Sequence, residues 1–227
     1  MLTDRYKAAM QFAATLHDGQ TRKGTQVAYL SHLMSVSALV MESDGNENEA
    51  IAALLHDSIE DRSHDYVSAF QVEPRHGRDA LKRDIELQFG SEVLAIVQQC
   101  TDDEYLPAGR RAEKGTPEEW RVRKEAYLAA LRQKSDVGAL RVSCADKLHN
   151  ARAILADYEI EGERLWQRFN VKSKRDQLWY YEGLADVLTE RSLMLGDAGL
   201  QRLARQLAAT VEAIARHAPE RAQKPGE

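Results

Sequence analysis

The chain has 227 residues, of which 43% are hydrophobic and 30% charged, a balance typical of a folded globular protein. Lys and Arg number 31 against 36 Asp and Glu, and the formal charge of −5 argues against a generic DNA- or RNA-binding surface. The apolar runs are too short for a membrane span, and we expect no signal peptide in MLTDRYKAAM. The sequence therefore predicts a cytoplasmic protein in which Cys100 and Cys144 stay reduced.

Apolar residues recur at three- and four-residue spacing along most of the chain, which is typical of amphipathic helices. Helices are predicted over 3–18, 31–42, 48–60, 117–133, 136–157, 160–168, 172–195 and 198–217. A short helical turn is predicted over 85–89, followed by a break at Gly90 and another helix to Cys100. Because no segment alternates apolar and polar residues, we expect an all-α helical bundle of about 8–11 helices.

The predicted bundle is one domain over residues 1–218, followed by a flexible tail at 219–227. Within it, residues 62–83 are charged and irregular, and we expect an inserted loop or a short helix there.

An imidazole and a carboxylate stand side by side in the apolar segment NEAIAALLHDSIE. Burying His56 and Asp57 there costs on the order of several kcal/mol unless a partner compensates, and a divalent cation would be such a partner. A lone buried histidine is more often hydrogen-bonded in the core, but the adjacent Asp57 makes that alternative harder to sustain. Glu60 and Asp61 follow at i+4 on the same helical face, unless they only end the helix on its solvent side.

Two further segments place polar residues among apolar ones. Asp146 lies in SCADKLHNAR, with Asn150 at i+4 and Lys147 and Arg152 close by. His32 lies in YLSHLM, where a core or capping role is the alternative. Two imidazoles and two carboxylates together suit an octahedral ion such as Mn²⁺ or Fe²⁺ better than a closed structural zinc site.

These segments resemble motifs of the HD-domain metal-dependent phosphohydrolases, and more narrowly of the hydrolase domain of RelA/SpoT-type alarmone enzymes. RKGTQVAYLSH resembles RKGTxxPYxxH of that domain, LLHDSIED resembles LLHDxxED, QFGSEVLAIVQQCTDD resembles FGxxVxxLVxxVTDD, and CADKLHNAR resembles ADKLHNxR. The motifs keep the family order over roughly residues 5–190. The short chain is similar to the stand-alone small alarmone hydrolases of the metazoan SpoT-homologue type.

The resemblance implies a metal centre and a catalytic pair. The implied metal ligands are His32, His56, Asp57 and Asp146. They would hold one ion, which we expect to be Mn²⁺, with Fe²⁺ or another divalent ion as alternatives. Glu60 and Asp61 match the family's acidic pair, which would position and activate the attacking water.

The resemblance also implies a nucleotide site. Its expected substrate contacts are Arg22, Lys23, Lys147, Asn150, Arg152 and Tyr180. For Arg22 and Lys23 the alternative is a solvated loop, and for Tyr180 it is packing in the helical core, with its register against Tyr181 left open.

The implied reaction is cleavage of the 3′ ester of (p)ppGpp to GDP or GTP and pyrophosphate, by a monomer or small homo-oligomer. The alternatives are an adenosine alarmone as substrate, an NADPH phosphatase or nucleotidase activity, and a regulator that binds nucleotides without catalysis. The sequence departs from the family in a longer segment at 62–85, in Leu33 where a proline is usual, and in Ala28 before Tyr29.

Overall fold

The computed structural model describes residues 2–68, 76–101 and 116–217 of the chain. Every regular element in these three ranges is a helix, and the only strand-like pairings there are isolated bridges between Thr21 and Ala28 and between Val67 and His76. The all-α prediction is therefore confirmed. No described helix combines the length and apolarity needed to cross a membrane.

The helices begin and end close to the predicted positions. They are α1 Asp4–Leu16, α2 Leu30–Glu42, α3 Glu47–Leu55, α4 Ser58–Arg62, α5 Gly77–Phe89, α6 Ser91–Cys100, α7 Pro117–Gln133, α8 Val137–Glu161, the 3₁₀ helix η2 Gly162–Arg168, α9 Lys174–Leu195 and α10 Ala198–Arg216. Local side chains fix several starts: Asp136 accepts a hydrogen bond from the Ala139 N–H of α8, and Thr116 and Glu119 form a capping box on α7.

The prediction of one continuous helix over 48–60 is wrong, because the helix is interrupted at His56 and Asp57, two of the predicted metal ligands. Helix α3 ends at Leu55, His56 and Asp57 form a turn, and α4 begins at Ser58. Apolar periodicity does not reveal this break, since Leu55 and Ile59 are both fully buried on either side of it. The Asp61 N–H still donates to the Asp57 carbonyl (2.9 Å), so the i+4 relation survives.

The segment predicted to be an inserted loop or a short helix is helical in its second part. Helix α5 starts at Gly77 and buries Leu81 and Ile85 completely in the core. The basic residues between these positions hid their helical spacing. Residues 69–75 of the expected insertion, and the predicted tail at 219–227, lie outside the described residues.

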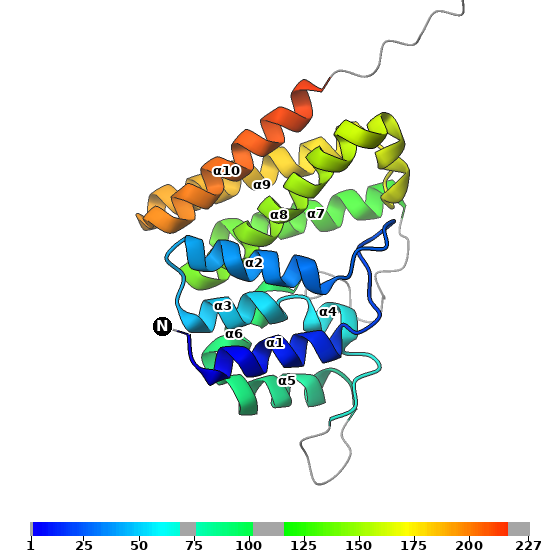
Figure 1. The fold of residues 1–227 in the computed structure, drawn as a ribbon. Helices are drawn as coiled ribbons and strands as arrows, with labels where there is room; N and C mark the ends of the chain where they lie inside the picture. The colour runs from blue at the N-terminus through cyan, green and yellow to red at the C-terminus, as the bar shows by residue number, and fades with distance from the viewer. Residues whose placement is uncertain (1, 69–75, 102–115, 218–227) are drawn as a thin grey trace, which may run out of the picture.

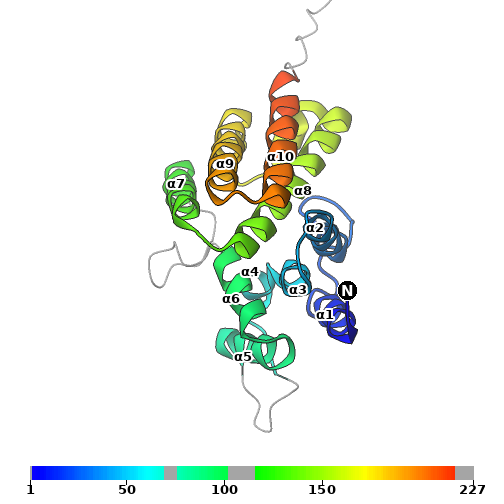
Figure 2. The same cartoon turned by 90° about the vertical axis from the view of Figure 1, so that its left-hand side faces the viewer.

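Helix α8 is the centre of the bundle. It contacts α2, α3 and α6 on one side and α9 and α10 on the other. Figures 1 and 2 show α1 to α6 forming one half of the molecule and α7, α9 and α10 the other, with α8 running between them. Residues on α2, on the turn after α3 and on α8 can therefore meet inside the protein.

Candidate metal centre and adjoining cavities

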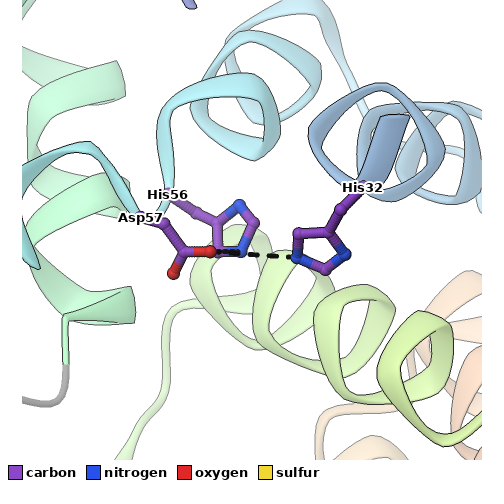
Figure 3. A group of neighbouring side chains, drawn as sticks. All are labelled: His32, His56 and Asp57. Carbon is purple, nitrogen blue, oxygen red and sulfur yellow. Dashed lines mark ion pairs between the residues drawn. The ribbon is translucent and has the colours of Figure 1, made fainter. Parts of the chain in front are cut away.

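The four predicted metal ligands converge from three parts of the chain. His32 comes from α2, His56 and Asp57 come from the turn between α3 and α4 (Figure 3), and Asp146 comes from α8. His32 Nε2 lies 3.2 Å from Asp146 Oδ1 and 3.8 Å from Asp57 Oδ2. His56 Nε2 lies 3.0 Å from Asp57 Oδ2 and 3.6 Å from Asp146 Oδ1. Each imidazole nitrogen thus lies within 4 Å of an oxygen of both carboxylates, and the ligand atoms of His32, His56 and Asp57 all lie within 4.8 Å of one another.

Outer hydrogen bonds turn the Nε2 atom of each histidine inward. His56 Nδ1 donates to the Ala53 carbonyl oxygen (2.9 Å), and His56 Nε2 is buried without a hydrogen-bond partner. His32 Nδ1 lies 2.8 Å from His149 Nδ1, so one of these two nitrogens donates to the other. Burial lowers the pKa of His32 although Asp146 opposes it, and burial, His32 and Arg22 lower the pKa of His149 to about 4. The contacts of the two Nδ1 atoms thus leave each Nε2 facing the cluster, which is the orientation that a metal ligand needs.

The two carboxylates stay ionised despite their burial. Burial raises the pKa of Asp57, but the neighbouring His56 outweighs it and holds the pKa well below its usual value. Burial likewise opposes ionisation of Asp146, but Lys147, whose Nζ lies 2.9 Å from Asp146 Oδ2, and the histidines lower its pKa. The Tyr29 hydroxyl donates to Asp57 Oδ2 at 2.5 Å, which holds that carboxylate in place.

The donor set fits a divalent cation. Burial lowers the pKa of His56, yet Asp57 and Asp146 outweigh it and raise that pKa well above its usual value. In the chain without a cation, a proton on His56 therefore offsets part of the charge of the two carboxylates. A divalent ion at the same point would replace that proton and give the unpartnered Nε2 a ligand role.

The predicted catalytic acids differ in their surroundings. Asp61 is half-buried and accepts a hydrogen bond from Gln20 Nε2 (2.7 Å), while Gln20 Oε1 lies 2.8 Å from His17 Nδ1. Burial and the charge of Asp57 raise the pKa of Asp61 to about 6. Glu60 is exposed on α4. The Gln20 contact thus fixes the orientation of Asp61, and burial with the nearby Asp57 sets its proton affinity.

Two predicted substrate contacts, Arg22 and Lys23, lie on a narrow turn in the loop between α1 and α2. The Arg22 N–H donates to Val27 O and the Tyr29 N–H donates to Gln20 O, both at 2.8 Å. Gly24 lies in the left-handed region (φ 74°), and a Cβ there would stand 2.8 Å from Cδ of Arg168. Glycine allows the turn to pack against η2.

A hydrogen-bonded chain links this turn to the metal cluster. Arg22 Nη2 donates to Asn150 Oδ1 (3.0 Å), and Asn150 Nδ2 donates to Asp146 Oδ1 (2.6 Å). Lys23 Nζ donates to Asn170 Oδ1 (2.8 Å). Two of the predicted contacts, Arg22 and Asn150, therefore lie within one network that ends on a metal-site carboxylate, and Lys23 bonds to Asn170 instead.

Two cavities open on either side of Asn150. One, of about 270 Å³, is lined by Arg22, Thr25, Ile154, Leu165, Arg168 and Phe169 among others, and we call it the apolar-walled cavity. The second, of about 260 Å³, is lined by Lys23, Arg123, Lys124, Lys147, Tyr180 and Trp120 among others, and we call it the cationic cavity. Lys23, Asn150, Phe169 and Tyr181 line both cavities.

The structure does not bring Arg152 to these cavities. Its side chain is exposed and donates to Gln206 Oε1 on α10 (2.5 Å). A larger cavity of about 520 Å³ lies between α1 and the segment that follows α4, and none of the predicted site residues lines it. Five of the six predicted substrate contacts thus face cavities beside the metal cluster.

Sequence reasoning missed the residues that support the ligands. Tyr29, Gln20 and His149 were assigned no role, although all three lie in or beside the quoted motifs. Their position beside the motifs was the available signal. Arg123 and Lys124 gave no signal, because α7 reads as an ordinary charged helix.

Comparison with known proteins identifies the family and agrees with the fold. The family model described as "HD domain" matches residues 9–172. The chain is 32% identical over 147 residues to the Xenopus tropicalis protein named guanosine-3′,5′-bis(diphosphate) 3′-pyrophosphohydrolase MESH1, a match covering 63% of this chain and 66% of the relative, just under two thirds. The Drosophila melanogaster protein of the same name is 29% identical over 180 residues, covering 78% and 80% of the two chains.

A solved structure shares the fold. It is described as "A metazoan ortholog of SpoT hydrolyzes ppGpp and plays a role in starvation responses", and it superimposes with a TM-score of 0.59 at 22% identity. The superposition covers 95% of this chain and 96% of the other. The expected resemblance is confirmed, and the chain belongs to the HD-domain family.

Proposed function

We propose that the protein is a metal-dependent hydrolase that removes the 3′-pyrophosphate from guanosine or adenosine alarmones, releasing pyrophosphate and the 5′-phosphorylated nucleoside. The observation that carries the proposal is the chain from Arg22 through Asn150 to Asp146, which joins nucleotide-sized cavities to the His/Asp cluster. The names of the Xenopus and Drosophila relatives support the same substrate class.

His32, His56, Asp57 and Asp146 would hold the cation, which we propose to be Mn²⁺. When bound, a divalent cation supplies Lewis acidity toward a phosphoryl oxygen and lowers the pKa of water. Tyr29 and His149 would keep Asp57 and His32 oriented, since the Tyr29 hydroxyl donates to Asp57 Oδ2 and His149 contacts the outer nitrogen Nδ1 of His32.

Asp61 would accept the proton of the attacking water. Its pKa of about 6 leaves it ionised at neutral pH but close enough to neutrality to be an effective base. Gln20 fixes the carboxylate from one side, and His17 in turn holds Gln20. Glu60, exposed on the same short helix, would complete the acidic pair from the solvent side.

The nucleoside would lie in the apolar-walled cavity, where Ile154, Leu165 and Phe169 offer a surface for a base. Arg22 would contact the phosphate next to the scissile bond and Asn150 the sugar. A cytoplasmic location, a monomeric or small homo-oligomeric state and the absence of nucleic-acid binding stay predictions from the sequence.

The test is a substrate panel with the purified protein and Mn²⁺. ppGpp, ppApp and NADPH are supplied separately, and released pyrophosphate and phosphate are measured independently. We expect pyrophosphate from one or both alarmones and none from the Asp57→Ala variant. Phosphate released from NADPH alone would assign the chain as a phosphatase instead. Binding of all three without turnover would make it a nucleotide-binding regulator.

A further inference from the structure

His17, at the end of α1, is a buried imidazole whose position is fixed from several sides. Only 3% of its surface is exposed. Its backbone N–H donates to the Ala13 carbonyl oxygen (3.0 Å), and its ring stacks on the ring of Tyr29, with centroids 5.5 Å apart and an angle of 23° between the planes. The ring of His17 is therefore held in one place and presents Nδ1 to the side chain of Gln20.

The hydrogen bonds from His17 to Asp61 can run in only one direction. Asp61 is ionised at neutral pH and can only accept, so Gln20 donates to it through Nε2 (2.7 Å). The other end of the Gln20 amide is the carbonyl oxygen Oε1, which can only accept. His17 Nδ1, 2.8 Å from Oε1, therefore carries the ring proton, because otherwise two lone pairs would face each other.

The other ring nitrogen of His17 supports the same assignment. Burial lowers the pKa of His17, although Gln20 and Asp57 oppose this effect, so the ring is neutral at neutral pH and carries one proton. His17 Nε2 is buried and has no hydrogen-bond partner among the described residues. A proton on Nε2 would be a buried donor without an acceptor, whereas a proton on Nδ1 is bonded to Gln20.

The backbone of Gln20 is anchored on both sides, so its side chain is the part that could move. The Gln20 N–H donates to the His17 carbonyl oxygen (3.0 Å), and the Tyr29 N–H donates to the Gln20 carbonyl oxygen (2.8 Å). If the side-chain amide reversed, its Oε1 could accept and retain a proton on Asp61, and that carboxyl group could not act again as a base. His17 opposes the reversal, because its Nδ1–H would then face the amide NH₂, which is also a donor.

We propose that His17 is a positioning residue for the proposed reaction: it locks the Gln20 amide in one orientation, and the locked amide keeps the Asp61 carboxylate oriented as a proton acceptor. The proposal rests on the proposed function, in which Asp61 accepts the proton of the attacking water. His17 acts through Gln20, since its ring bonds to Gln20 and not to Asp61. Its loss should therefore slow turnover and leave substrate and metal binding unchanged.

A double-mutant cycle tests whether His17 acts through Gln20. The kcat and KM for ppGpp are measured with Mn²⁺ for wild type, His17→Phe, Gln20→Leu and the combined variant; phenylalanine keeps a ring against Tyr29 but has no N–H. Each single variant should lower kcat about tenfold with KM and Mn²⁺ content unchanged, and the combined variant should be no slower than Gln20→Leu. His17→Asn, whose side-chain amide can donate in place of Nδ1–H, should recover most of the lost kcat. An equal fall in kcat from His17→Phe in both backgrounds would overturn the proposal.

A second measurement needs neither metal nor substrate. In ¹⁵N NMR spectra of the metal-free wild type, the His17 ring should carry its proton on Nδ1, and one Gln20 side-chain amide proton should be shifted downfield by its bond to Asp61. His17→Phe should lose that downfield shift and His17→Asn should keep it, with circular dichroism verifying that each variant is folded. A wild-type ring protonated on Nε2, or an unchanged Gln20 signal in His17→Phe, would overturn the proposal. A protein with the expected spectra that hydrolyses no alarmone would refute the proposed function, whereas a hydrolysing protein without them would refute the role of His17 alone.

Discussion

Replacing Tyr29 by phenylalanine probes the metal site without touching a ligand. The hydroxyl donates to Asp57 Oδ2 (2.5 Å), and its own pKa is raised by burial and by the charges of Asp57 and Asp61, so it remains a donor at every accessible pH. The ring lies against His17 with centroids 5.5 Å apart, and phenylalanine preserves this contact. The substitution therefore removes one hydrogen bond and little else.

The expected loss of metal affinity follows from the hydrogen bond between Tyr29 and Asp57. A hydrogen bond to an ionised group contributes about 1.5–3 kcal/mol, and loss of an outer-shell partner typically weakens metal binding about 10–100-fold. Because Tyr29 is half-buried, we expect the lower end, about a tenfold increase in the Kd for Mn²⁺. Without the hydroxyl, Asp57 is freer to rotate and is protonated more easily, and both effects disfavour the ion.

The chain offers a matched control in Tyr66, whose hydroxyl donates to Asp84 Oδ2 (2.7 Å) away from the metal cluster. Calorimetric titration of the metal-stripped proteins with Mn²⁺ gives the affinity, and urea unfolding gives the stability. Tyr29→Phe and Tyr66→Phe should both lower the free energy of unfolding by about 1 kcal/mol. Only Tyr29→Phe should weaken Mn²⁺ binding. An unchanged Kd in Tyr29→Phe, or an equal change in both variants, would refute the assigned role.

Three further predictions concern catalysis, substrate binding and pH. Asp61→Asn should lower kcat about 100-fold or more while Mn²⁺ content, measured by elemental analysis, stays stoichiometric; loss of the metal would make Asp61 a ligand. Arg22→Ala should raise KM for ppGpp about tenfold or more and Arg152→Ala should leave it nearly unchanged, since Arg22 bonds to Asn150 beside the cavities and Arg152 bonds to Gln206; equal effects in steady-state assays would contradict this. Burial opposes ionisation of Asp197, but its contacts with the Leu200 N–H and with Arg141 outweigh burial and lower the pKa of Asp197. The ionised Asp197 therefore stabilises the fold above about pH 4, and this stabilisation is lost as the pH falls through the folded-state pKa. Asp197→Asn should therefore be less stable than wild type by about 1 kcal/mol at pH 7 and equally stable near pH 2 by urea unfolding, and a difference independent of pH would count against this ion pair.

The ligand residues could be predicted because each is a polar side chain in an apolar setting. His32, His56 and Asp146 are almost fully buried, and a buried polar side chain needs a polar or charged partner. The spacing of the apolar residues around them placed all three inside predicted helices. The same spacing could not locate the turn at His56 and Asp57, since apolar residues continue on both sides of it. That turn gives Asp57 its direction toward His32 and His56, and only the folded chain reveals it (Figure 3).

The supporting residues depend on contacts that the sequence does not encode locally. Tyr29 reaches Asp57 because the turn from Gln20 to Tyr29 folds back on itself. The spacing of apolar residues does not predict turns of this kind. Arg123 and Lys124 read as a solvated helical face, and only the packing of α7 against α9 places them beside Tyr180. Arg152 was predicted to contact substrate because it lies near Asn150 in the sequence. Its side chain instead lies on another side of α8, where it donates to Gln206.

Anomalous diffraction from crystals grown with Mn²⁺, recorded at the manganese edge, tests the metal centre most directly. We expect one strong peak within coordination distance of His32 Nε2, His56 Nε2, Asp57 and Asp146, and its loss in crystals of Asp57→Ala. A wild-type structure with no peak among these four side chains, or with its only ordered manganese at another place, would contradict the proposed metal centre.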